Sequence, residues 1–199
     1  MKLRLGAWAA LFVFVLGFAF VRVGAATELP ATSVYRLDVP LVDQDGRALR
    51  FDEKRGGPML VTMFYTSCKY VCPLIIDTLL ATDRALDPAE RARLGVLVVS
   101  FDPERDDPSA LKRVADKRRL DVPRWTLART EAPDVRKLAA VLGIQYRALA
   151  DREINHTSAL VLLDAEGRIV ARTDKLGEVD PAFVAKVKAT LGEKPARTP

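Results

Sequence analysis

Two uninterrupted apolar runs predict buried strands. Residues 58–65 and 96–101 are apolar at nearly every position, and each run is too short to form a helix. A strand that is apolar on both sides is expected where both faces of the sheet are covered. Shorter apolar segments predict further strands at residues 125–128, 145–149, 159–163 and 169–173.

A hairpin is predicted close to the start of the folded region. Residues 37–42 and 48–51 flank a polar stretch at 43–46 that ends in glycine, a composition typical of a hairpin loop. A similar polar turn at residues 164–167 joins the last two predicted strands. These turns indicate that parts of the sheet are antiparallel.

Helices are predicted between the strands. Asp107-Pro108 and Asp180-Pro181 each combine an N-cap residue with a proline at the first helical position. Strands that alternate with helices, followed by a hairpin and a closing helix, predict one α/β domain over residues 34–191. Its expected architecture is a mixed central sheet flanked by helices, with an N-terminal hairpin extension. The helices are predicted at residues 73–86, 108–120, 133–142 and 181–191.

Composition and charge narrow the class of protein. The 199 residues are 49% hydrophobic and 29% charged, which is typical of a folded chain with a sizeable core. Of the net charge of +5, three charges come from Lys2, Arg4 and Arg22, so about +2 remains after Ala25. This charge is too weak, and too poorly interleaved with aromatic residues, to predict binding to nucleic acid.

The N-terminus has the pattern of a targeting segment. Positive charges precede an uncharged apolar stretch at residues 5–21, and small residues follow it, so residues 1–25 are expected to be a signal peptide or a membrane anchor. We favour the uncleaved anchor. Charge on the N-terminal side predicts that the domain is exported, to the periplasmic side of the inner membrane. Residues 26–33 are expected to be a linker, and residues 192–199 a disordered tail.

The residues best suited to metal binding or redox chemistry are two cysteines and one histidine. Cys68 and Cys72 are the only cysteines, and His156 is the only histidine. Two thiols and one imidazole are a complete ligand set for a soft metal such as copper. Two thiols alone are equally a disulfide switch. An ordinary structural disulfide is disfavoured, because the cross-linked loop would be too short to remove much entropy from the unfolded chain.

Pro73 shapes the expected geometry of the thiols. A proline disfavours helical backbone in the residue before it, so Cys72 is predicted to cap a helix that begins at Pro73. Cys68 would then lie in the loop that leaves the preceding strand. The helix dipole and its free amides should lower the pKa of both thiols. The redox interpretation is weakened because three residues, rather than the usual two, separate the cysteines.

Three motifs resemble the SCO/SenC family of copper-binding assembly proteins. Residues 65–74 resemble the metal loop of that family, residues 99–106 its second signature, and residues 156–167 its third. The resemblance extends over residues 34–191. It implies a thioredoxin-like fold in which Cys68, Cys72 and His156 bind copper, as Cu(I) or Cu(II).

The same resemblance implies a function and partners. The family matures the dinuclear copper site of cytochrome c oxidase, by delivering copper or by reducing the cysteines of that site. The expected partners are the copper-site subunit of the oxidase, a copper donor and a thiol reductase. A copper chaperone without catalytic turnover is favoured here, and a thiol–disulfide oxidoreductase that uses Cys68 and Cys72 as a redox pair is the alternative.

Two positions qualify the resemblance. Asp102 falls at the acidic position of the second signature and is expected near the metal loop, in support of the ligands. Its sequence context, Asp102-Pro103, equally suits a turn former. Lys69 stands where many family members have a proline after the first cysteine, and this difference removes no ligand.

Overall fold

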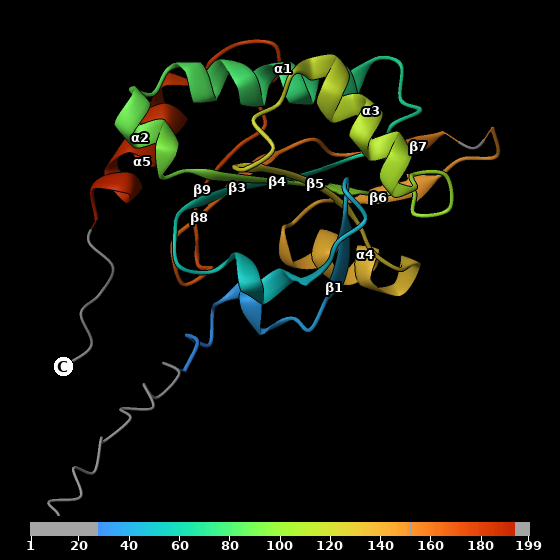
Figure 1. Cartoon of the computed structure of the whole chain (residues 1–199), viewed down its shortest axis with the longest axis horizontal. Coiled ribbons are helices and arrows are strands. Elements are labelled where there is room, and N and C mark those ends of the chain that lie inside the picture. The colour runs from blue at the N-terminus through green and yellow to red at the C-terminus, as the bar shows by residue number, and fades with distance from the viewer. Residues whose placement is uncertain (1–27, 152, 194–199) are drawn as a thin grey trace, which may run out of the picture.

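The computed structural model describes residues 28–151 and 153–193. A mixed sheet of seven strands, in the order β2-β1-β5-β4-β3-β8-β9, forms the centre of the domain, and β6 and β7 pair in a second, two-stranded sheet (Figure 1). The strands are β1 (Pro40–Asp43), β2 (Ala48–Arg50), β3 (Met59–Phe64), β4 (Gly95–Ser100), β5 (Trp125–Arg129), β6 (Tyr146–Ala148), β7 (Ile154–His156), β8 (Leu160–Leu163) and β9 (Ile169–Thr173).

Helices cover both faces of the central sheet. In Figure 1, α1 and α3 lie above the sheet and α4 lies below it. This arrangement explains why every residue of β3 is buried. The helices are α1 (Val71–Arg84), α2 (Pro88–Ala92), α3 (Pro108–Arg118), α4 (Ala132–Val141) and α5 (Pro181–Gly192), with short 3₁₀ helices η1 (Val34–Arg36) and η2 (Phe51–Lys54).

The pairing of the strands confirms the predicted mixed sheet and its hairpin extension. β3, β4 and β5 are parallel neighbours, whereas β8 runs antiparallel to β3, and β9 antiparallel to β8. The N-terminal hairpin of β1 and β2 joins the sheet through antiparallel pairing of β1 with β5. Asp107 and Asp180 cap α3 and α5 as predicted, each followed by proline in the first turn.

Three local predictions were wrong or incomplete. α1 begins at Val71 after Tyr70, so Cys72 lies inside the first turn and is not the cap. Proline is tolerated throughout that turn, because the first four N–H groups of a helix have no partner within the helix. The short helix α2, which Asp87 and Glu90 begin with reciprocal capping hydrogen bonds, was not predicted, and neither was β7.

Several predicted segments lie outside the described residues. These are the targeting segment at residues 1–25 and residues 194–199 of the tail. Within residues 28–151 and 153–193, no helix is long and apolar enough to cross a membrane. The predicted linker at residues 26–33 is described from residue 28 onwards. Its last residue, Ser33, is buried, and the Ser33 hydroxyl donates to the carbonyl of Glu166 at 2.5 Å.

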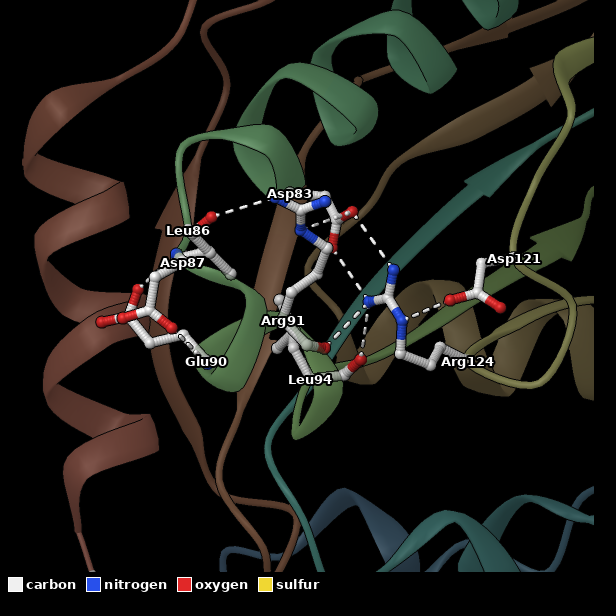
Figure 2. A network of polar contacts seen from close by, with 8 residues as sticks. All are labelled: Asp83, Leu86, Asp87, Glu90, Arg91, Leu94, Asp121 and Arg124. Carbon is white, nitrogen blue, oxygen red and sulfur yellow. Dashed lines mark hydrogen bonds and ion pairs between the residues drawn. The ribbon is translucent and has the colours of Figure 1, made fainter.

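A polar network around Arg124 joins the end of α1 to the strands (Figure 2). The Arg124 guanidinium donates to both carboxylate oxygens of Asp83, at 3.0 and 3.2 Å, and to Asp121 at 2.7 Å. It also donates to the carbonyls of Arg91 and Leu94. The side chain is only 16% exposed, so Arg124 connects α1, the α2–β4 turn and the start of β5 from a largely buried position.

Candidate thiol and metal site

Three segments that are distant in sequence meet at one edge of the sheet. β3 and β4 are parallel, so the loops that follow them lie side by side at their carboxyl ends. β8 is antiparallel to β3 and therefore begins at this same edge, where the preceding β7 ends. The loop after β3 carries Cys68, α1 carries Cys72, and β7 ends at His156.

Cys72 is the protected thiol of the pair. Its side chain is 3% exposed, and its sulfur accepts a hydrogen bond from the backbone N–H of Tyr65 at 3.3 Å. Burial raises the pKa of Cys72 well above its usual range, and the charge of Cys68 adds to the effect. The expected lowering of the pKa is therefore wrong for this thiol, because burial outweighs the hydrogen bond from the amide of Tyr65.

Cys68 is the less buried and more acidic thiol. Its sulfur accepts a hydrogen bond from the backbone N–H of Cys72 at 3.3 Å. Burial acts to raise the pKa of Cys68, but hydrogen bonds from the backbone of Cys72 and Tyr70, and then from the Cys72 side chain, outweigh it and lower the pKa. The site thus combines one sulfur that loses its proton readily with one that retains it.

His156 presents one ring nitrogen to the buried thiol. Its Nε2 lies 3.9 Å from the sulfur of Cys72, and its Nδ1 lies 3.2 Å from the carbonyl oxygen of Thr157. A carbonyl can only accept, so Nδ1 carries the proton and the lone pair of Nε2 points towards Cys72. Burial lowers the pKa of the imidazole, which keeps it neutral and able to bind a metal.

The aromatic neighbours of His156 were not predicted as part of the site. The ring of Phe101 lies 4.8 Å from the imidazole between centroids, and the ring of Tyr65 meets it edge-on at 6.1 Å. The Tyr65 hydroxyl donates to Glu153 at 2.7 Å and accepts from the N–H of Ile154 at 3.3 Å. Tyr65 therefore ties the strand that carries His156 to the start of the thiol loop. Its position at the end of a buried strand, directly before the loop, is the signal that could have identified it.

The carboxylate that supports the loop belongs to Asp106. Its oxygens accept from the N–H of Thr66 at 3.0 Å, the hydroxyl of Thr66 at 2.5 Å and the hydroxyl of Ser100 at 2.5 Å, and the residue is fully buried. The Asp102 carboxylate instead pairs with Arg105, while the backbone carbonyl of Asp102 accepts from Asp106 in a turn. The turn-forming interpretation of Asp102 thus describes its contacts.

The donor set is suited to a soft metal, although the side chains are not gathered around one point. Within the described ranges, no group of three or more His, Cys, Asp or Glu side chains is arranged so that it could hold a metal ion as it stands. Cys72 and His156 are close enough to share an ion, whereas the sulfur of Cys68 is engaged with the amide of Cys72. The three side chains would have to rearrange before they could hold one ion together.

Comparison with known proteins places the chain among proteins of one family. The family model described as SCO1/SenC matches residues 31–192. The SCO1 protein homolog of Bacillus subtilis is 23% identical over 131 residues, which cover 64% of this chain and 67% of that protein.

Solved structures share the fold. The structure of Bradyrhizobium japonicum ScoI with copper bound is 24% identical with a TM-score of 0.63, and the match covers 77% of this chain and 98% of that one. BsSco, described as a member of the Sco family of cytochrome c oxidase assembly proteins with a disulfide switch, is 19% identical with a TM-score of 0.67, over 79% of this chain and 94% of that one. These likenesses confirm the predicted thioredoxin-like α/β fold. With a family model that covers nearly all of the described domain, the chain belongs to the SCO1/SenC family.

Proposed function

We propose that this protein binds copper through Cys68, Cys72 and His156 and delivers it during the assembly of cytochrome c oxidase. Copper is the cargo of the protein in this function. Two kinds of relative support the proposal: family structures that hold copper, such as Bradyrhizobium japonicum ScoI, and a family member described as an oxidase assembly protein.

The observation that carries the proposal is the approach of His156 to Cys72. The two side chains come from segments 84 positions apart, yet Nε2 and the sulfur are 3.9 Å from each other. The contact of Nδ1 with Thr157 leaves Nε2 as the free donor. A purely redox pair of thiols has no need of an imidazole oriented in this way.

The three proposed ligands contribute differently to the binding and release of the ion. Two thiolates satisfy Cu(I), and the imidazole nitrogen adds a donor that Cu(II) favours more strongly. Because burial raises the pKa of Cys72, binding at that sulfur must release its proton, so copper affinity should rise with pH. Cys68 lies on an open loop, which permits exchange of the ion with the ligands of a partner.

Copper loading of the reduced protein tests the proposal. Wild type, loaded without oxygen and then desalted, should retain one copper ion per chain, whereas Cys68→Ala should retain essentially none. Ser67→Ala changes the exposed neighbour in the same loop and is the matched control. Full copper retention by Cys68→Ala would contradict the proposal.

A second candidate function is reduction of a partner's disulfide. The lowered pKa of Cys68, caused by hydrogen bonds that outweigh its burial, favours this chemistry. The Cys68 thiolate would attack the partner disulfide and release one partner thiolate. Cys72 would then displace the second, leaving the pair oxidised and the partner reduced. If His156→Ala kept full oxidase assembly in cells while Cys72→Ala lost it, this second function would be favoured over copper delivery.

Both proposed functions require the same cellular location and the same partner proteins. The targeting pattern at residues 1–25 supports an exported domain, anchored at the periplasmic side of the membrane, where thiols are oxidised unless they are reduced again. A thiol reductase and a copper donor are therefore proposed partners, with the copper-site subunit of the oxidase as recipient. Recovery of the intact chain from washed membranes would support the anchor, and recovery of a shortened soluble form would contradict it.

A further inference from the structure

A pocket of about 290 Å³ opens directly beside Cys68. Its inner wall is formed by the apolar side chains of Phe64, Ile76 and Val114, which come from β3, α1 and α3. Cys68 lines the same pocket and is the less buried of the two thiols. A group that enters the pocket would therefore contact apolar surface and meet the less buried of the two sulfurs.

The outer part of this pocket is positively charged. Lys69, Lys117 and Arg118 line it, and no carboxylate is among the lining residues. Arg118 pairs with Asp77 at 2.5 Å, but Lys69 and Lys117 are exposed, and neither ammonium group forms an ion pair with an acidic side chain of the described residues. The pocket thus presents two uncompensated positive charges beside Cys68.

Exposed apolar side chains extend the surface on the helix side of the loop. Tyr70 is 84% exposed, although tyrosine is usually at least partly buried. Val71 and Leu74, in the first turn of α1, are 39% and 38% exposed. An apolar surface next to a positively charged pocket has the composition of a docking site for another protein.

We propose that this surface docks a segment of the recipient protein in which a cysteine is flanked by acidic side chains. The proposal rests on the proposed function and specifies the chemistry of its partner. The apolar wall accommodates the body of the segment, and Lys69 and Lys117 attract its carboxylates, so that its cysteine is presented to Cys68. Charge complementarity of this kind selects acidic partners and disfavours basic ones.

The test measures the rate at which Cys68 reacts with two aromatic disulfides. Dithiobis(nitrobenzoate) carries a carboxylate on each ring, and dithiodipyridine is neutral. In each reaction the Cys68 thiolate forms a new disulfide with one half of the probe, the S–S bond of the probe breaks, and the other half leaves as a coloured thiolate or thione. The ratio of the two rates cancels any change in the intrinsic reactivity of the thiol.

The variant Lys69→Gln/Lys117→Gln removes the two free charges. We expect the ratio of anionic to neutral rates to fall about fivefold at low ionic strength, and high salt to lower the wild-type ratio in the same direction. Arg136→Gln/Lys137→Gln removes two positive charges from α4, on the opposite face of the sheet, and should leave the ratio unchanged. An unchanged ratio in the first variant, or an equal fall in the second, would overturn the proposal.

The probes contain no metal, so the two proposals can fail separately. A protein that showed the charge preference but did not retain copper would contradict the proposed function alone. Copper retention together with a ratio that did not depend on Lys69 and Lys117 would contradict the docking proposal alone.

Discussion

The sulfur of Cys72 lies 3.9 Å from Nε2 of His156, and the Nδ1 of that imidazole is held by the carbonyl of Thr157. A buried thiol and an oriented nitrogen donor therefore face each other. The pairing depends on the antiparallel alignment of β8 with β3, which brings the end of β7 to the start of α1.

Removal of His156 should separate the two oxidation states of copper. In His156→Ala, affinity for Cu(II) should fall on the order of 100-fold and affinity for Cu(I) less than about tenfold, because two thiolates already satisfy the softer ion. Competition titrations against chelators selective for each ion would measure both affinities. Asn155→Ala alters the exposed neighbour in β7 and should change neither. Equal losses for the two ions would contradict the assignment of His156 as a nitrogen donor.

The two thiols should differ in reactivity. In the reduced protein near neutral pH, iodoacetamide should modify Cys68 at least about tenfold faster than Cys72. Hydrogen bonds from the backbone of Cys72 and Tyr70 lower the pKa of Cys68 despite its partial burial, whereas burial raises the pKa of Cys72. Mass spectrometry of timed digests would give both rates, and the difference should disappear in denaturant. Faster modification of Cys72 would show that the loop is arranged differently in solution.

The fold was predictable where a single local signal determined it. The apolar runs that became β3 and β4 are buried on both faces, and the Asp-Pro pairs at the starts of α3 and α5 act through their own side chains. β7 was missed because its three residues are held by pairing with β6, a contact that local sequence does not encode. The start of α1 was misplaced because Pro73 is compatible with more than one position in the first turn.

The site was predictable only in part for a related reason. Cysteine and histidine are so rare in this chain that their chemistry identified them without any geometry. The supporting residues Tyr65 and Asp106 belong to common types, and their roles depend on which strands are neighbours. Asp102 and Asp106 lie in the same motif, and only the turn between them decides which carboxylate reaches Thr66.

Tyr65→Phe should loosen the strand that carries His156. The variant keeps the ring but loses the hydrogen bonds to Glu153 and to the N–H of Ile154, and leaves those groups without their partner. We expect a loss of about 1–3 kcal/mol in the free energy of unfolding. Cu(II) affinity should fall while one Cu(I) per chain is still bound. Urea unfolding and copper titration would measure the two effects. Unchanged hydrogen exchange at the amide of Ile154 would contradict this positioning role.

The single histidine should make the free energy of unfolding depend on pH. Burial lowers the pKa of His156 in the folded protein from its ordinary 6.5, so near and below this pH the unfolded chain binds the proton more strongly. The free energy of unfolding of the reduced, metal-free protein should therefore decrease as pH falls through about 6.5 towards the lower folded pKa. His156→Gln should flatten this part of the profile, as urea titrations at several pH values would show. The same slope in wild type and variant would exclude His156 as its source.

Arg124→Met should destabilise the whole domain without changing the thiol chemistry. Methionine occupies a similar length of side chain but leaves the buried Asp83 without the guanidinium that donates to both of its oxygens (Figure 2). It also removes the guanidinium hydrogen bonds to the carbonyls of Arg91 and Leu94. Removing one partner of a largely buried ion pair costs about 3 kcal/mol or more, and urea unfolding would measure the loss.

Arg136→Met on α4 is the control: it changes an exposed arginine in the same way and should cost less than about 0.5 kcal/mol. The rate ratio of Cys68 and Cys72 towards iodoacetamide should stay at the wild-type value, because the network lies at the far end of α1 from both thiols. A loss for Arg124→Met no larger than that of the control would mean that Asp83 is solvated in solution and that this network does not hold α1 to the sheet.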